Sequence, residues 1–284
     1  MKLSVIYHHN DLDGICSAVV MQNYLESKGF FVAAIPVQYG DRWDAELVSR
    51  VDFVAVVDFT FPDMNALSAA SQLIWIDHHE TAQKLNPELW NDPKIAGIRS
   101  IDLAACELTW HWCTIGMRTP NIVKWIGDRD IWKFAFNPYT TLVCATAFLK
   151  LTSADSEDWP LLMDPIDSAK IEDEYISQGK ILQEAQKKRI IDAVQHGRRV
   201  RLEGFNTLAV NATNDTSELG QFIYTELDYE LALIYNIDEN LKTRCSLRSN
   251  RPDVNCATIA QKFGGGGHKG AAGFIIDNIM DLLV

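Results

Sequence analysis

The stretch Tyr7-His8-His9-Asn10-Asp11-Leu12-Asp13-Gly14 combines two adjacent histidines with two aspartates and a glycine. It ends an apolar run and precedes residues 15–27, whose apolar positions have helical spacing. In an extended chain the alternating His9, Asp11 and Asp13 would share one face. One imidazole and two carboxylates at a strand end are typical ligands of a divalent cation, and the closing glycine allows a sharp turn into the helix. The alternative is a polar loop with an aspartate near the helix N-cap.

The composition and net charge of the chain restrict the kinds of ligand that it could bind. The chain has 284 residues, 47% hydrophobic and 23% charged, which is ordinary for a globular protein of one large or two modest domains. Its formal net charge of −12 argues against holding long nucleic acids by general electrostatics, because that mode needs a basic surface. A small anion can still bind where metals and a few arginines invert the sign locally.

Cysteine usage and hydropathy bear on the compartment. None of the six cysteines forms a CxxC pair and four lie in apolar segments, which indicates reduced thiols rather than a disulfide framework. No basic, apolar leader opens the sequence, and no apolar run approaches the roughly 18 residues of a membrane span. We therefore expect a cytoplasmic protein with no membrane partner.

The first half alternates predicted strands and helices. The near-continuous apolar strands favour a parallel sheet covered on both faces, where ligands bind at the carboxyl ends of the strands. The strands are predicted at residues 3–8, 30–37, 52–59 and 73–76. Helices are predicted near 66–70 and at 101–115, 122–126 and 141–150, with a loop at 127–132.

The second half has a different character. Residues 155–165 contain two prolines and several acids and mark the best boundary, and 166–194 have long helical periodicity. Short strands follow at 200–202, 207–211, 231–236, 243–248 and 274–276, with helices at 219–227 and 254–263. The expected fold class is α/β, with a parallel-sheet N-terminal domain (1–155), a helical linker (156–197) and a smaller α+β C-terminal domain (198–284).

Further candidate ligands follow other predicted strands. Asp58 ends an apolar strand, and Asp77-His78-His79 ends the next one. Adjacent strand residues point to opposite sides, so one histidine would bind metal while the other faces a substrate oxygen. The alternatives are a helix N-cap for Asp58 and a chance surface pair for the histidines.

The loop predicted after residue 126 supplies one more carboxylate, either Asp128 or Asp130, and the other would be a solvated partner of Arg129. Four aspartates with two histidines suit a two-metal site, in which paired cations clamp a phosphoryl group and generate hydroxide. Two divalent cations balance four carboxylates, and the mixed nitrogen and oxygen set fits Mn²⁺ better than an all-oxygen Mg²⁺ or Ca²⁺ cage.

A glycine tract stands near the C-terminus. Four glycines precede His268, and no bulky side chain occurs over residues 264–273 apart from His268 and Lys269. Backbone without Cβ atoms can approach a ligand closely and present N–H groups to an anion, whereas the alternative is a flexible turn. Arg248 would supply a forked phosphate contact, unless it is an ordinary surface arginine.

Together these motifs resemble the DHH phosphoesterase superfamily. HNDLDG at 9–14, VVDF at 56–59, DHH at 77–79 and the late Asp130 match its motifs in order. SLRS at 246–249 and GGGGHKGAAG at 264–273 are similar to the DHH-associated C-terminal domain, which binds substrate. Members include RecJ-like exonucleases, nano-RNases with pAp phosphatase activity, cyclic-dinucleotide phosphodiesterases, exopolyphosphatases and family II pyrophosphatases.

The resemblance implies a role for each matching residue. His9 and Asp11 would hold one Mn²⁺, Asp13, His78 and Asp130 the other, and the catalytic Asp58 would bridge both. The catalytic His79 would contact the scissile phosphate or stabilise the leaving oxygen. The far end of the substrate would be held by Arg248, Gly265, Gly266, Gly267 and His268. Asp130 is preferred because the family often has an aromatic four residues later, as Phe134 is, although Trp132 fits Asp128 equally.

The expected function is an exonuclease-like, two-Mn²⁺ phosphodiesterase that hydrolyses short oligonucleotides as an oligoribonuclease (nano-RNase), with Mg²⁺ or Co²⁺ as substitutes. The alternatives are a pAp phosphatase, a cyclic-dinucleotide phosphodiesterase, or a non-enzymatic sensor that sequesters a nucleotide. The expected partners are short single-stranded oligonucleotides or nucleotide phosphates, and a homodimer is left open. The sequence does not separate RNA from DNA or give the polarity.

Overall fold

The computed structural model describes residues 2–164, 167–267 and 269–282. The chain divides into two compact units, Met1–Gln183 and Glu184–Val284. Among the described residues, the helices are all too short or too polar to span a bilayer. The domain boundaries at 155 and 197 stay a prediction.

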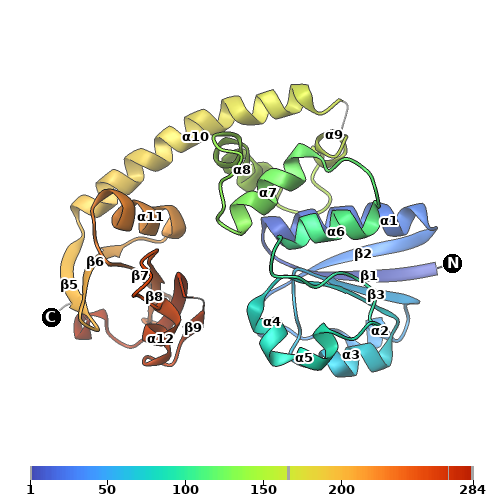
Figure 1. Cartoon of the computed structure of the whole chain (residues 1–284), viewed down its shortest axis with the longest axis horizontal. Coiled ribbons are helices and arrows are strands. Elements are labelled where there is room, and N and C mark those ends of the chain that lie inside the picture. Colours follow the sequence, from blue (N-terminus) through green and yellow to red (C-terminus); the bar gives the residue numbers. More distant parts are fainter. Residues whose placement is uncertain (1, 165–166, 268, 283–284) are drawn as a thin grey trace. The chain divides into compact units, whose positions relative to one another are not determined.

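The first unit is built on a four-stranded parallel sheet (Figure 1). Its strands are β1 (Lys2–His9), β2 (Phe30–Val37), β3 (Phe53–Val57) and β4 (Leu73–Ile76), in the order β2-β1-β3-β4. The next strand in the sequence, β2, pairs with one edge of β1, and the strand after it, β3, pairs with the opposite edge of β1. The carboxyl ends of β1 and β3 therefore flank a topological switch point, where open α/β sheets bind ligands.

Helices cover both faces of this sheet (Figure 1). Val54 and Val56 of β3 pack into one cluster with residues of α3 (Met64–Ala70), whereas Ala55 and Val57 pack into another with α1 (Leu12–Ser27). Successive strand side chains point to opposite faces, so a strand buried on both sides must be apolar throughout. This is why the strands read as continuous apolar runs.

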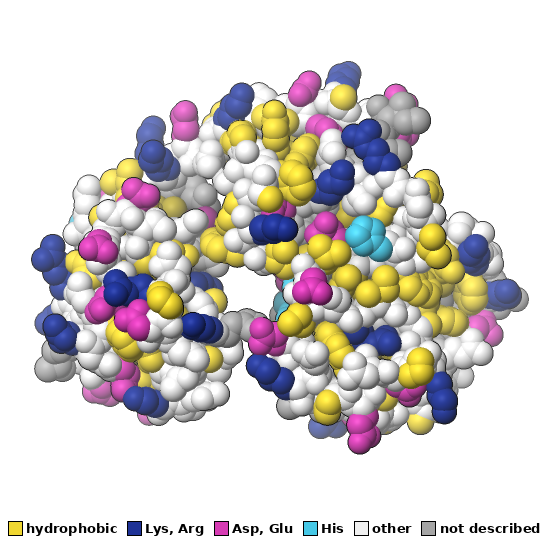
Figure 2. Space-filling model, viewed as in Figure 1, with side chains coloured by type: hydrophobic (Ala, Val, Ile, Leu, Met, Phe, Trp, Pro, Cys, Tyr) yellow, Lys and Arg dark blue, Asp and Glu magenta, His cyan; other side chains and the backbone are white. Residues whose placement is uncertain are grey.

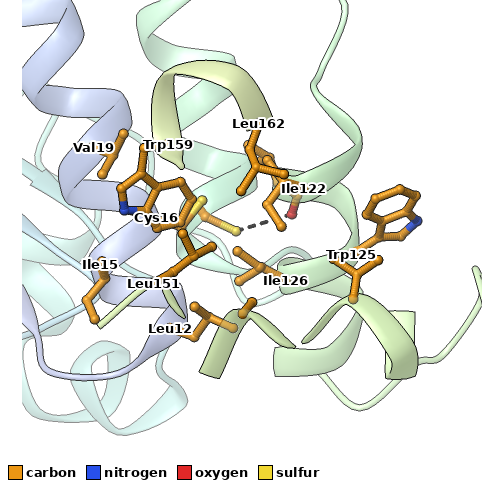
Figure 3. Close-up of a cluster of buried hydrophobic side chains, with 14 of the residues drawn as sticks. Leu12, Ile15, Cys16, Val19, Ile122, Trp125, Ile126, Leu151, Trp159 and Leu162 are labelled. Carbon is orange, nitrogen blue, oxygen red and sulfur yellow. Dashed lines mark hydrogen bonds between the residues drawn. The ribbon is translucent and has the colours of Figure 1, made fainter. Parts of the chain in front are cut away.

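A third cluster joins α1 to the remaining helices of the first unit. Figure 3 shows Leu12, Ile15, Cys16 and Val19 of α1 with Trp159, Leu151, Ile122 and Ile126, all buried. This cluster fixes α7, which matters because α7 carries Asp130. The other helices are α2 (Ala45–Val48), α4 (Glu80–Leu85), α5 (Pro87–Trp90), α6 (Ala105–Cys113), α7 (Asn121–Asp130), α8 (Tyr139–Lys150) and α9 (Trp159–Leu162).

Two predictions about the helices were wrong. The predicted helix 101–115 begins only at Ala105, where the carboxylate of Asp13 accepts the first N–H groups of α6. The predicted loop at 127–132 is helical as far as Asp130. Gly127 faces the Glu107 side chain of α6, where a Cβ atom would lie 2.6 Å from Oε2, and it does not end the helix.

The long helix α10 (Ala169–Gln195) runs from the first unit into the second, and it adds Ile171 and Tyr175 to one core and Ile190 to the other. The second unit is a mixed sheet with the order β5-β6-β7-β8-β10-β9, in which β6 and β7 are parallel and the other neighbours antiparallel. Its elements are β5 (Arg198–Leu202), β6 (Phe205–Asn211), α11 (Thr216–Glu226), β7 (Leu231–Ile237), β8 (Thr243–Arg248), α12 (Cys256–Gln261), β9 (Gly266–Gly267), β10 (Ala271–Ile276) and a 3₁₀ turn η1 (Ile279–Asp281). The predicted fold class, a parallel-sheet domain followed by a smaller α+β domain, is confirmed.

Candidate metal centre

The first candidate ligands lie where β1 turns into α1. His9 ends β1 and its Nδ1 atom lies 2.8 Å from Asp11 Oδ2, while Asp11 Oδ1 accepts the Gly14 N–H at 2.9 Å as the cap of α1. Asp13 is already helical, so the expected alternation of an extended chain does not reach it. A Cβ atom on Gly14 would lie 2.1 Å from the His9 carbonyl oxygen. Glycine is therefore needed for close approach of helix and strand, not for the turn that the sequence suggested.

Asp13 is buried and joins two helices. Its oxygens accept the N–H groups of Ala105 and Cys106, both at 2.9 Å, at the start of α6. Asp13 Oδ2, which accepts the Ala105 N–H, also lies 3.7 Å from His78 Nε2. A carboxylate fixed by two backbone donors keeps its position without help from solvent, so Asp13 can face a cation from a rigid support.

Asp58 follows β3 and occupies the middle of the cluster. It is only 1% exposed, and its backbone has a positive φ of 56°, a conformation that aspartate tolerates and that is frequent at functional sites. Oδ1 lies 3.2 Å from His78 Nε2, and Oδ2 lies 3.8 Å from His9 Nδ1. Yet neither oxygen accepts a well-formed hydrogen bond from any described residue.

This arrangement is electrostatically unfavourable for Asp58 alone. Burial raises the pKa of Asp58 well above its ordinary value, and the nearby charges of Asp13, Asp11 and Asp130 raise it further. A buried carboxylate without donors normally costs free energy, whereas a cation among these oxygens would relieve both the burial and the repulsion. The residues present therefore fit a divalent metal.

The six predicted ligands are brought together by the fold. Three sets of side chains each place one ligand atom per residue within 4.8 Å of one another. The sets are His9, Asp11 and Asp58; Asp13, His78 and Asp130; and Asp58, His78 and His79. Asp58 belongs to the first and third sets and His78 to the second and third, so these two residues connect the three sets.

The two late aspartates differ in their surroundings. Asp128 is buried, and its oxygens accept the N–H groups of Ala135 (2.8 Å) and Phe136 (3.1 Å) and the hydroxyl of Thr140 (2.6 Å). Asp130 Oδ2 lies 3.4 Å from His78 Nε2 with its side chain 28% exposed. The geometry favours Asp130 as the ligand, and Asp128 is a buried anchor of the loop after α7 instead of a solvated residue.

His78 and His79 do not diverge as expected, because β4 ends at Ile76 and the alternation of a strand ends with it. Their ring centroids are 4.6 Å apart. His79 Nδ1 lies 2.7 Å from Asp77 Oδ1, and Asp77 also accepts a hydrogen bond from the hydroxyl of Thr60. Burial alone would lower the pKa of His79, but the bond with Asp77 raises it to about 9.

Sequence patterns assign no role to Asp77 or Thr60. Asp77 is fully buried, and besides the His79 ring it accepts the backbone N–H groups of His78 (2.7 Å) and His79 (3.1 Å). It therefore fixes the orientation of both histidines. The sequence gives one indication of this role: Asp77 directly follows an apolar strand, and a carboxylate in that position is buried and needs hydrogen-bond donors.

The remaining predicted residues belong to the second unit. Arg248 is partly buried on β8, where its guanidinium donates to the Leu247 carbonyl (2.9 Å) and the Ser217 hydroxyl (3.4 Å). Gly265 and Gly267 approach β10 so closely that Cβ atoms would lie 2.1 Å and 2.6 Å from backbone oxygens.

Packing therefore accounts for these two glycines, while a Cβ atom on Gly266 would meet open space. His268 lies outside the described residues. The binding roles of Arg248 and the glycines stay predictions.

A parallel sheet holds clustered carboxylates and imidazoles at its carboxyl edge, and a smaller α+β unit follows it, so the first unit carries the groups that a metal-dependent hydrolase needs. Comparison with protein families agrees: residues 4–132 match the N-terminal domain of the DHH family, and residues 206–283 match the DHHA1 domain. The chain belongs to the DHH superfamily of phosphoesterases.

Individual relatives are distant. The chain is 24% identical to an uncharacterized protein of Acanthamoeba polyphaga mimivirus, over 98% of this chain and 68% of that protein. It is similar to the DHH domain of a member of a ribosomal-protein family (14% identity, 99% of this chain and 84% of that one, TM-score 0.68). It is also similar to RecJ of Thermus thermophilus in complex with Mn²⁺ (14% identity, 97% and 50%, TM-score 0.56). At these identities the structural likeness shows the fold alone.

Proposed function

We propose that this protein is an exonuclease-like phosphodiesterase that uses two Mn²⁺ ions to hydrolyse short oligonucleotides from one end. The observation that carries the proposal is Asp58, a buried carboxylate that accepts no well-formed hydrogen bond from the described residues and lies between two groups of candidate metal-ligand side chains. Such a residue is costly unless cations complete its environment. The similarity to RecJ structures that contain Mn²⁺ or Mg²⁺ supports a divalent cation at this site.

Each ligand has a place in this proposal. His9 and Asp11 would hold one cation, Asp13, His78 and Asp130 the other, and Asp58 both. Mixed imidazole and carboxylate ligands suit Mn²⁺, with Mg²⁺ or Co²⁺ as substitutes. Bound divalent cations act as Lewis acids on phosphoryl oxygens and lower the pKa of water, so they supply both charge stabilisation and a nucleophile.

His79 would act on the substrate directly. Asp77 holds its Nδ1 atom at 2.7 Å, which leaves Nε2 as the ring atom available to a phosphate oxygen. In that position the ring would donate a hydrogen bond to the scissile phosphate or to the leaving oxygen, and Asp77 would keep it oriented through the reaction.

Charge supports short substrates over long ones. The net charge is −12, and on the face shown in Figure 2 the Lys and Arg side chains are scattered among acidic and apolar ones without a continuous basic band. Binding along a long polyanion would need such a band. Arg248 and the glycines near residue 266 would hold the far end of a short substrate. All six ligands are present, which favours an enzyme over a sequestering protein.

The test is a time course with Mn²⁺ on end-labelled RNA and DNA of two to about twenty nucleotides, beside pAp and cyclic dinucleotides. Rapid loss of the shortest oligonucleotides, stepwise from one end, is the expected result. Asp58→Asn serves as the negative control and should remove nearly all hydrolysis while the fold persists. Turnover of pAp or cyclic dinucleotides alone, or of long strands preferentially, would contradict the proposed substrate.

A further inference from the structure

An exposed aromatic ring lies directly against the candidate metal centre. Tyr39 follows β2, and its ring centroid is 5.4 Å from that of His9 and 6.4 Å from that of His79. It also lies 5.5 Å from the ring of the buried Phe59. Although it contacts three rings, Tyr39 remains 64% exposed. The ring is supported from within the site while much of its surface is open to a ligand.

The backbone holds this ring in place. Residues 38–41 form a turn in which the Gln38 carbonyl accepts the Asp41 N–H (3.0 Å) and Asp41 Oδ2 accepts the Gln38 N–H (2.8 Å). Gly40 has φ of 105°, as the third residue of a type II turn requires, so Tyr39 occupies the second position. Two hydrogen bonds close the turn at both ends, so the orientation of Tyr39 is largely preset.

The turn is also tied to the residues that carry the candidate ligands. The side-chain amide of Gln38 donates a hydrogen bond to the Asn10 carbonyl (3.4 Å), and the backbone N–H of Asn10 donates one to the Val37 carbonyl (3.1 Å). Asn10 stands between His9 and Asp11, so the ring and two candidate ligands share one hydrogen-bonded framework. Other exposed aromatic residues in the described chain, such as Phe31 and Phe136, make no ring contact with His9 or His79.

We propose that Tyr39 is the platform on which a nucleobase of the substrate stacks, and that it gives the site its preference for nucleotides over phosphodiesters without bases. This inference rests on the proposed function and names a residue that selects the substrate. A base is joined to its phosphate through one sugar, so a phosphate held at the metal centre leaves its base within reach of a ring beside His9. Stacking on an aromatic ring is tolerant of sequence, because every base has a π face.

The competing explanation is that Tyr39 only positions His9. A positioning residue would alter metal binding and the hydrolysis of every substrate alike, whereas a stacking platform acts only on substrates that carry a base. The comparison therefore uses a dinucleotide and an abasic analogue with the same sugar-phosphate backbone, assayed with the full chain and Mn²⁺.

For Tyr39→Ala we expect KM for the dinucleotide to rise about tenfold, as loss of one base–aromatic stack predicts. KM for the abasic analogue should stay within about twofold, and Tyr39→Phe should behave like the wild type because the ring is kept. Phe31→Ala is the matched control, since Phe31 is equally exposed at the other end of β2, and it should change neither value. Equal changes for both substrates, or no change for either, would overturn the proposal.

A second measurement separates this inference from the proposed function. If the wild type hydrolyses neither substrate, the proposed function fails, and binding of a 2-aminopurine nucleotide with Mn²⁺ decides the role of Tyr39. Stacking should quench the fluorescence in the wild type and not in Tyr39→Ala, while Mn²⁺ binding measured by electron paramagnetic resonance stays equal. No quenching in the wild type, equal quenching in both proteins, or Mn²⁺ binding lowered in Tyr39→Ala would overturn the inference.

Discussion

Asp128 and Asp130 stand two positions apart on α7 and meet different environments. Asp128 turns inward and accepts hydrogen bonds from the loop that follows, whereas Asp130 faces His78. Neither sequence spacing nor the aromatic residues that follow distinguish the two. Substitution of Asp128 and substitution of Asp130 should therefore have different effects.

Asp130→Ala should lower Mn²⁺-dependent turnover by at least about 100-fold. Loss of a residue that only supports a metal ligand can already cost about 100-fold, and loss of a ligand itself should cost more. The free energy of unfolding of the metal-free protein should change little, because the side chain is partly exposed. Asp128→Ala should instead lower the free energy of unfolding by about 2–4 kcal/mol, because buried donors lose their acceptor. Denaturant unfolding and steady-state kinetics on both variants check this. The reverse pattern would make Asp128 the ligand.

The identities of the candidate ligands were predictable, but their geometry was not. Aspartates and histidines that follow apolar strands are informative, because carboxyl ends of parallel strands meet at one edge. The expected face-sharing of His9 and Asp13 failed since β1 ends at His9. Asp77 has no role assigned from the sequence, because that role depends on which neighbours its side chain faces: the His79 ring, two residues later, and the hydroxyl of Thr60, 17 residues earlier.

Among the helices and strands, the strands were the easiest to predict. The strands β2, β3 and β4 consist of apolar residues alone, so a continuous apolar run marks each of them. Helix ends were harder, since α6 begins where Asp13 caps it and α7 continues through Gly127. Both ends are set by tertiary contacts between residues far apart in the sequence.

A pH-dependent contact connects two elements of the second unit. Arg189 and Gln186 of α10 donate to the carboxylate of Asp215, the residue that precedes α11, at distances from 2.9 Å. Burial alone would raise the pKa of Asp215, but these bonds lower it below its ordinary 3.8. A lowered folded-state pKa means that this stabilisation is present above pH 3.8 and is lost as the pH falls through the folded-state value.

Asp215→Asn should therefore reduce the free energy of unfolding at pH 7 by about 0.5–1 kcal/mol, a modest effect because Arg189 is largely exposed. Asparagine tolerates the left-handed backbone that residue 215 adopts, so the substitution removes the charge and one of the two acceptor oxygens without straining the chain. Denaturant unfolding at several pH values should show the difference from the wild type narrowing below about pH 4. Asp192→Asn, an exposed carboxylate on the same helix, is the control. A difference that stays constant with pH would contradict this origin.

Across the full chain, the two compact units carry different parts of the proposed activity. The candidate metal ligands all belong to the first, and Arg248 with the glycine tract belongs to the second. The class of fold followed from the change between apolar parallel strands and short alternating ones. The substrate did not follow, because one fold hosts many functions and no motif in this sequence separates the candidate substrates.

Arg248→Ala tests whether the second unit takes part in binding. KM should rise about tenfold for a dinucleotide, as loss of a charged hydrogen bond predicts, and stay within about twofold for bis(p-nitrophenyl) phosphate. Arg244→Ala is the matched control, because Arg244 lies on the same strand and pairs with Asp238. Equal effects of Arg248→Ala on both substrates would show that Arg248 does not contact the nucleotide.

The proposed activity depends on Asp58 being shared by two cations. Equilibrium dialysis against Mn²⁺ is the decisive experiment, with the wild type and Asp58→Asn compared at the same concentration. Asparagine tolerates the left-handed backbone and nearly matches the shape of aspartate, so the fold should persist. We predict about two Mn²⁺ per wild-type chain and one or none, bound more weakly, in Asp58→Asn. Equal numbers bound with equal affinity by the two proteins would show that Asp58 is not shared.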